Sequence, residues 1–140
     1  MKKLVSMLLS VLFITAVLTP SFCLAVTEEP YEPPIDIEEY SLTTTISASL
    51  SINGGTAHAA GAVGCRYANG HCSITVKLQK KDSNGAWHSI KTWTNSGTLA
   101  TSAGGDYSVS SGSYRTCVTA TVTYNGSSEH PYKYSGTKTC

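Results

Sequence analysis

The sequence is short of several residue types, and the shortages fall mainly after its first 25 residues. Both methionines and both phenylalanines lie at or before position 22, so the remaining chain has neither. Charged residues make up only 14% of the whole. What remains is Ser, Thr, Gly, Ala and Tyr, with Val, Ile and Leu at periodic positions. Hydroxylated and β-branched residues favour extended strands over helices, so we expect an all-β protein.

Sequence patterns of common enzymes are also missing. The chain has no G-x-S-x-G nucleophile turn, and no spacing of a serine with a histidine nominates a catalytic triad. Glycoside cleavage needs two carboxylates, and the three acids after Ser41 all lie in turn-like contexts: Asp82, Asp106 and Glu129. We therefore expect no catalytic residue. A small secreted hydrolase is the weakest alternative.

Metal-ligand spacing is absent as well. His71-Cys72 together with Cys65 contains zinc-ligand residue types, but their spacing matches no common zinc pattern. His71 reads as a solvent-facing turn residue, and His58 falls in the polar phase of its strand. We expect no metal and no cofactor.

The first 25 residues have the layout of a secretory signal peptide. Lys2 and Lys3 precede an apolar run from Leu4 to Leu18, and Cys23-Leu24-Ala25 supplies small residues for cleavage. The run is shorter than the roughly 20 residues needed to span a bilayer. An uncleaved anchor and a lipoprotein signal at Cys23 are the alternatives. The sequence predicts a secreted protein with no stable membrane insertion after cleavage.

Charge is divided unevenly along the mature chain. Residues 26–40 hold six acids and three prolines, and we expect a flexible acidic leader because such a segment buries little apolar surface. Residues 41–140 hold eight Lys/Arg against three acids. This basic excess predicts attraction to an anionic polymer, weakened by the leader.

Residues 41–140 read as a row of short strands. Asn-Gly pairs at 53–54, 69–70, 84–85 and 125–126 separate runs with alternating apolar residues, a pattern typical of β-hairpins. The predicted strands lie at 42–52, 57–65, 72–78, 87–94, 98–109, 114–122 and 132–140. About seven strands with one apolar face predict an antiparallel two-sheet sandwich.

Tyr114 follows a Gly-containing turn and opens an alternating strand, which resembles the tyrosine corner of immunoglobulin and fibronectin type III domains. We expect its ring to be buried and its hydroxyl to bond the preceding turn. Trp87 and Trp93 are expected to cap a core that has no Phe. The alternative for the aromatic residues is a stacking platform for sugar formed by Trp87, Trp93, Tyr107, Tyr132 and Tyr134.

Four cysteines remain after signal cleavage, and an even number in an exported chain predicts two disulfides. Alternation places Cys65 and Cys72 inward and Cys117 outward, with Cys140 in the phase of Lys138, also expected outward. The expected bridges are Cys65–Cys72 and Cys117–Cys140.

The mature chain also resembles a group of small secreted proteins of Gram-positive bacteria. The resemblance rests on Thr75 to Lys81 (TVKLQKK), Trp87, Trp93 and Tyr107 to Arg115 (YSVSSGSYR), beside the signal peptide, acidic leader and Thr/Ser-rich first strand. It implies a secreted immunoglobulin/fibronectin type III-like sandwich and no particular activity. The four cysteines are not part of the pattern.

The sequence therefore predicts an extracellular, non-enzymatic protein that binds an anionic cell-wall polymer or another extracellular protein, and no nucleic acid. The candidate binding residues are Lys80, Lys81, Lys133, Lys138, Tyr132 and Tyr134. A bacteriocin-like toxin or antagonistic factor is the alternative from a different class.

Overall fold

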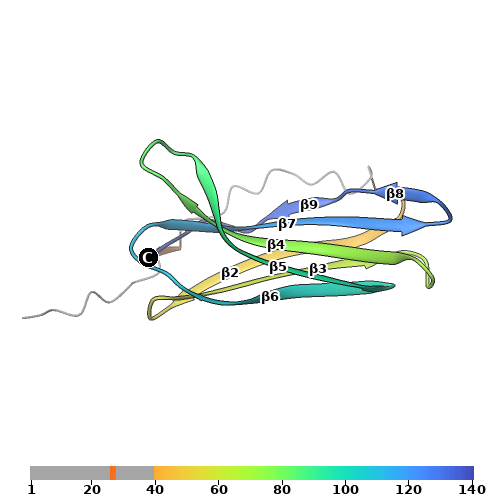
Figure 1. Ribbon diagram of the computed structural model, residues 1–140, viewed down its shortest axis with the longest axis horizontal. Coiled ribbons are helices and arrows are strands. Elements are labelled where there is room, and N and C mark those ends of the chain that lie inside the picture. Colours follow the sequence, from red (N-terminus) through yellow and green to blue (C-terminus); the bar gives the residue numbers. More distant parts are fainter. Residues whose placement is uncertain (1–25, 28–39) are drawn as a thin grey trace, which may run out of the picture.

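The structure, a computed structural model, describes residues 26–27 and 40–140 (Figure 1). This part of the chain is all-β, with two antiparallel sheets and no helix, which confirms the all-β, two-sheet part of the predicted fold class. The predicted signal peptide (1–25) and residues 28–39 of the predicted leader lie outside the described residues. Two leader residues, Val26 and Thr27, form strand β1 and pair with Thr139 and Lys138.

The larger sheet has seven strands, and its centre is the pair β4 and β7. Its order is β1-β10-β7-β4-β5, with β8 and β9 also pairing with β7. The strands are β1 (Val26–Thr27), β4 (His71–Lys81), β5 (Trp87–Thr98), β7 (Ser113–Tyr124), β8 (Ser127–Glu129), β9 (Tyr132–Tyr134) and β10 (Lys138–Thr139). The tip of the β4–β5 hairpin projects beyond the two layers (Figure 1).

The smaller sheet has three strands in the order β2-β3-β6. They are β2 (Thr43–Asn53), β3 (Thr56–Cys65) and β6 (Ala100–Ser108). A single residue between strands, Leu99, connects β5 of the larger sheet to β6 of the smaller one and has a positive φ of 69°. Its backbone N–H donates to Gly70 and its carbonyl accepts from Cys65, so the crossing is held by hydrogen bonds.

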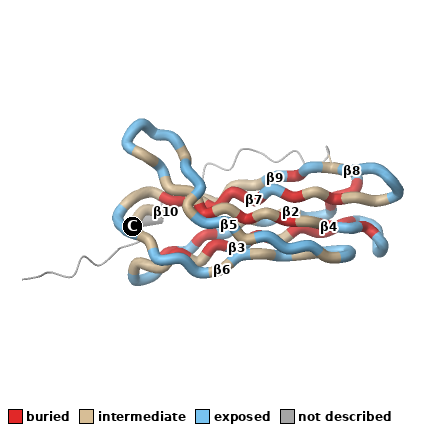
Figure 2. The backbone as a smooth tube through the Cα atoms, in the orientation of Figure 1, coloured by how far each residue is buried: buried red, intermediate tan, exposed pale blue. Residues whose placement is uncertain are grey.

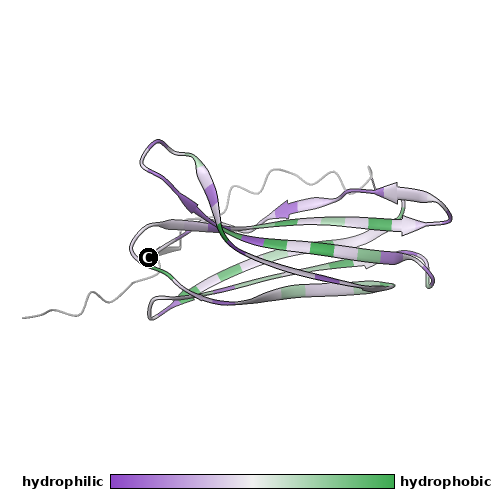
Figure 3. Ribbon diagram, viewed as in Figure 1, coloured by the Kyte–Doolittle hydropathy of each residue, from purple (hydrophilic) through white to green (hydrophobic). Residues whose placement is uncertain are grey.

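The core lies between the two layers, where Figure 2 shows the buried segments. On β4 the inward positions are Ile74, Val76 and Leu78, each at most 2% exposed. The matching hydrophobic bands alternate along β4 in Figure 3. Because side chains alternate between faces of a strand, this pattern leaves the residues between them on the opposite face of the sheet. That opposite face of the seven-stranded sheet is called the outer face below.

Three of the four Asn-Gly pairs lie in connections between paired antiparallel strands. At Asn125-Gly126 φ is 48° and 79°, and β7 turns directly into β8. Positive φ at both central residues is the geometry of a type I′ hairpin turn, which Asn-Gly favours.

The prediction of a hairpin at Asn69-Gly70 is wrong. β3 and β4 belong to different sheets, and neither turn residue has a positive φ. Gly70 has a steric role, because a Cβ at this position would collide with the Cys65 sulfur. The dipeptide predicted a change of direction but carried no information on whether the flanking strands pair.

The last predicted strand, 132–140, is broken into pieces that lie along β7. β8, β9 and β10 pair with its residues 122–124, 117–119 and 113–114 in turn. Pro131 interrupts the first junction because proline has no N–H to donate, although its carbonyl still accepts from Ala120. At the second junction the Ser135 hydroxyl accepts from the Thr116 N–H.

Tyr114 lies on the inward face at the start of β7. It is 1% exposed, and its hydroxyl donates to the Ser110 carbonyl at 2.7 Å, the geometry expected of a tyrosine corner. The Lys80 ammonium lies 5.5 Å from the ring centroid. Of the two tryptophans expected to cap the core, Trp93 packs against it, whereas Trp87 is not among the residues that do.

The predicted disulfides are not found. Cys65 and Cys72 both face the core as expected, but the structure contains both as buried free thiols. Burial raises the pKa of Cys72, and the neighbouring Cys65 raises it further.

Cys117 is also a free thiol, so its expected bridge to Cys140 is wrong. Cys140 exchanges hydrogen bonds with Gly112, five residues along the chain from Cys117. At about 3.3 Å per residue the separation is roughly 16 Å, far beyond the reach of a disulfide. Cys140 also packs against the core, although an outward position was expected. Alternation along a strand predicts which face of the sheet a side chain lies on, but not which residues of neighbouring strands pair. The pairing of β10 with β7 is what keeps Cys117 and Cys140 apart.

Candidate functional site

The outer face of the seven-stranded sheet gathers aromatic and basic side chains at one end. Val76 and Leu78 are buried, so Lys77 and Gln79 of β4 alternate outward. The same alternation on β7 turns Arg115 outward from its buried neighbours Tyr114 and Thr116. The pairing of Gln79 with Arg115 brings these side chains together on adjacent strands.

Arg115 lies between two aromatic rings. Its guanidinium carbon is 4.4 Å from the centroid of Trp87 and 4.2 Å from that of Tyr134, within the range of a cation–π contact. Its Nε donates to the Gln79 side-chain carbonyl at 2.8 Å. We call Trp87, Arg115 and Tyr134, which come from β5, β7 and β9, the aromatic–cation row. The guanidinium is therefore held in place before any ligand arrives.

Two further residues extend this row. The Lys81 ammonium lies 5.7 Å from the Trp87 ring centroid. At the other end, Tyr132 meets Tyr134 edge to face with centroids 6.0 Å apart. Tyr132 is 55% exposed, the highest fraction among the large hydrophobic residues that the structure describes. Burial raises the pKa of the Tyr134 hydroxyl, and the adjacent Cys117 thiol adds to the increase, so Tyr134 is neutral at physiological pH.

The three acidic side chains of residues 41–140 all have partners outside the aromatic–cation row. Glu129 accepts hydrogen bonds from Ser41, Leu42 and Thr43, fixing the start of β2 against β8. Burial raises the pKa of this carboxyl, but the hydrogen bonds from Leu42, Ser41 and Thr43 outweigh that effect and leave the pKa below its ordinary value.

The other two acids each pair with a histidine. Asp82 binds His88 at 2.7 Å, and this hydrogen bond, with those from the Ala86 and Asn84 amides, lowers the pKa of Asp82. Asp106 binds His58 at 2.5 Å on the three-stranded sheet. None of the three carboxylates engages a cation of the aromatic–cation row, so the charge of Arg115 is not neutralised by an ion pair among the described residues.

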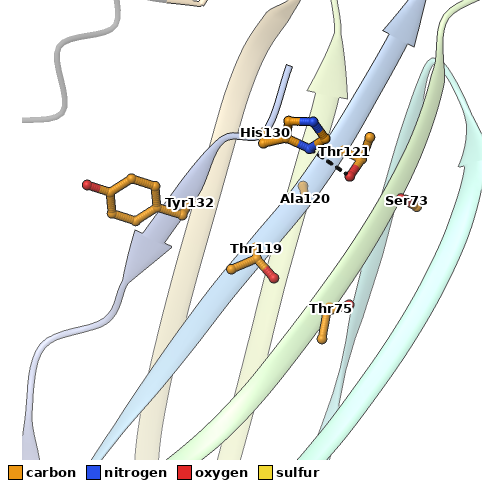
Figure 4. A pocket seen from close by; sticks show the side chains of 7 residues that line it. All are labelled: Ser73, Thr75, Thr119, Ala120, Thr121, His130 and Tyr132. Carbon is orange, nitrogen blue, oxygen red and sulfur yellow. Dashed lines mark hydrogen bonds between the residues drawn. The ribbon is translucent and has the colours of Figure 1, made fainter. Parts of the chain in front are cut away.

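Next to the row the outer face is hollowed and lined with hydroxyl groups. Figure 4 shows the residues around this hollow of about 390 Å³, on β4, on β7 and on the chain leading into β9. They are Ser73, Thr75, Thr119, Ala120, Thr121, His130 and Tyr132. The His130 Nδ1 lies 3.2 Å from the Thr121 hydroxyl. Tyr132 borders both the hollow and the row, which makes them one continuous surface.

The structure brings together only some of the residues expected to bind. Lys81, Tyr132 and Tyr134 lie at this surface. Lys80 instead covers Tyr114 and donates to the Ser110 hydroxyl at 3.0 Å. Lys133 of β9 pairs with Val118, and Lys138 of β10 pairs with Tyr114. Both partners are inward residues of β7, so neither lysine belongs to the outer face.

Arg115 is the central residue that sequence reasoning missed. Its signal was present, because the residue after an inward Tyr114 must face outward. Of the five aromatic residues considered for a sugar platform, Trp87, Tyr132 and Tyr134 do share this face. Trp93 packs against the core, and Tyr107 lies on β6 of the other sheet.

Pairing also aligns Ser51, His58 and Asp106 in one row across β2, β3 and β6. The His58 and Asp106 side chains are 41% and 66% exposed, and no hydrogen bond joins Ser51 to His58 among the described residues. The group therefore lacks the Ser–His hydrogen bond of a catalytic triad, and we assign it no catalytic role. The described part of the chain has no cluster of three His, Cys, Asp or Glu side chains able to hold a metal, and no helix long and apolar enough to cross a membrane.

Comparison with known proteins identified no relative of this chain. No model of a protein family matches the chain, and no curated protein matches it in sequence.

Proposed function

We propose that this is a secreted, non-enzymatic protein that binds an anionic polymer at the cell surface through the outer face of its seven-stranded sheet. The observation that supports this most directly is the aromatic–cation row. Arg115 is held between two rings, Lys81 lies beside it, and no carboxylate of the described residues forms an ion pair with it. A guanidinium fixed in this way loses little conformational freedom when an anionic group binds.

We further propose that the domain is immunoglobulin/fibronectin type III-like. Three features support this assignment: a three-stranded sheet facing a larger one, a chain that passes between the layers, and a buried Tyr114 bonded to the turn before it. The resemblance to small secreted proteins of Gram-positive bacteria fits the same assignment.

The test is binding of purified protein to poly(glycerol phosphate), measured by co-sedimentation on coupled beads. Exposed charges are screened over about 8 Å at physiological ionic strength, so retention should fall steeply between about 50 and 300 mM salt. Arg115→Gln should weaken retention. The matched control is Arg66→Gln, because Arg66 is an exposed residue just after β3, near the opposite end of β4 from Lys81.

Removal of residues 26–40 should strengthen retention, since six acids leave with the segment. Electrostatic attachment is wrong if retention responds neither to salt nor to Arg115→Gln. A specific protein partner would then be the better explanation of the exposed aromatic surface.

A further inference from the structure

The hollow beside the aromatic–cation row presents a small grid of hydroxyl groups. Ser73 pairs with Thr121 and Thr75 with Thr119 across β4 and β7, so the four side chains form two rows of two on one face (Figure 4). Neighbouring strands lie about 4.8 Å apart, and residues on one face of a strand repeat every 6.6 Å or so. The grid therefore has a regular spacing set by the backbone.

These hydroxyl groups are available to a ligand. Among the described residues, Ser73, Thr75 and Thr119 form no side-chain hydrogen bond, and Thr121 bonds only the nearby His130. Each hydroxyl can donate one hydrogen bond and accept two. No Lys, Arg, Asp or Glu side chain lines the hollow.

An aromatic ring borders the grid on the side of the row. Tyr132 is 55% exposed, and it leads through its contact with Tyr134 to Arg115. Neutral donors and acceptors beside an exposed aromatic ring suit a polyhydroxylated ring, which has polar edges and apolar faces. A phosphate or carboxylate alone can accept hydrogen bonds from these hydroxyls, but it has no apolar face to pack on Tyr132.

From this arrangement we infer that the hollow is a sugar subsite, and that the ligand is an anionic glycopolymer whose charged groups bind the aromatic–cation row. This inference rests on the proposed function, and it narrows the ligand from polyanions in general to polyanions that contain sugar rings. Ser73, Thr75, Thr119 and Thr121 supply the hydrogen bonds, and Tyr132 supplies the apolar contact.

The test compares two probes, polygalacturonate, which carries a carboxylate on every sugar unit, and linear polyphosphate, which has no sugar. Wild-type protein should bind polygalacturonate more tightly at equal ionic strength. Thr75→Val and Thr119→Val remove hydroxyls with little change of shape. Each should lower affinity for polygalacturonate about two- to tenfold, the effect of one net hydrogen bond, and leave polyphosphate binding unchanged. Tyr132→Ala should act in the same selective way.

The matched control is Thr45→Val, since Thr45 is an exposed threonine on β2 of the other sheet. The sugar subsite is wrong if the Thr75 and Thr119 variants leave both affinities unchanged or lower both equally. If Arg115→Gln still weakens both probes in that case, the proposed function stands without it. If neither probe binds, or Arg115→Gln affects neither, the proposed function fails and the subsite with it.

Discussion

Replacement of Tyr114 tests the packing at the start of β7 most directly. The ring is 1% exposed, so truncation to alanine removes a large buried aromatic group and leaves a cavity. The expected loss is about 3 to 5 kcal/mol of the free energy of unfolding. Tyr114→Phe keeps the ring and removes only the hydroxyl that donates to Ser110. Because Ser110 is exposed, water can reach its carbonyl, and the expected loss is about 0.5 to 1.5 kcal/mol.

Urea unfolding followed by tryptophan fluorescence would measure both losses by linear extrapolation. Tyr107→Ala is the control, because Tyr107 is 37% exposed on β6 and its truncation should cost less than about 1 kcal/mol. A loss below about 1 kcal/mol for Tyr114→Ala would refute the reasoning. An equal loss for Tyr114→Phe and Tyr114→Ala would show that the hydrogen bond, and not the ring, carries the stability.

Three further predictions concern other parts of the domain. The structure has three buried thiols, Cys65, Cys72 and Cys117. A thiol reagent should therefore leave them unmodified in native protein and label all three in urea. An intact mass that shows bridges among them would contradict the structure. Glu129→Gln should destabilise the protein by about 1 to 3 kcal/mol near neutral pH, because the hydrogen-bonded carboxylate is lost. Folding lowers the pKa of Glu129 below its ordinary value of 4.5, so this stabilisation is present above that pH and is lost as the pH falls through the folded-state pKa. The free energies of unfolding of wild type and variant should therefore converge in acid. A difference that stays constant with pH would exclude the effect. Gly70→Ala should lower the melting temperature, because the new methyl group displaces the Cys65 sulfur, and an unchanged melting temperature would show that this turn has room to adjust.

The sandwich could be predicted because its signal is local. Alternation along β4 and β7 identifies the inward residues one strand at a time, and it correctly placed Ile74, Val76 and Val118 in the core. The turn chemistry at Asn125-Gly126 is local in the same sense. Each of these features depends on residues a few positions apart.

What sequence reasoning missed depends on the pairing of distant segments. The aromatic–cation row joins residues 87, 115 and 134, and only the registers of β4 with β5 and β7, and of β7 with β9, bring them together. The same information was missing for Cys117 and Cys140. Nothing local distinguishes an outward Cys opposite another Cys from one opposite Tyr134.

The broken last strand also affects how copies of the molecule meet. An open sheet edge offers unpaired N–H and C=O groups to any other chain, and proline or a break in the strand makes the edge a poor template. Beyond β7 the edge is divided into β8, β9 and β10, with Pro131 at the first division. At the opposite edge β5 extends for 12 residues. Within this sheet, aggregation by strand addition at high concentration is therefore directed to β5 and not to the divided edge, and a proline placed at an outward-pointing N–H of β5 should reduce it.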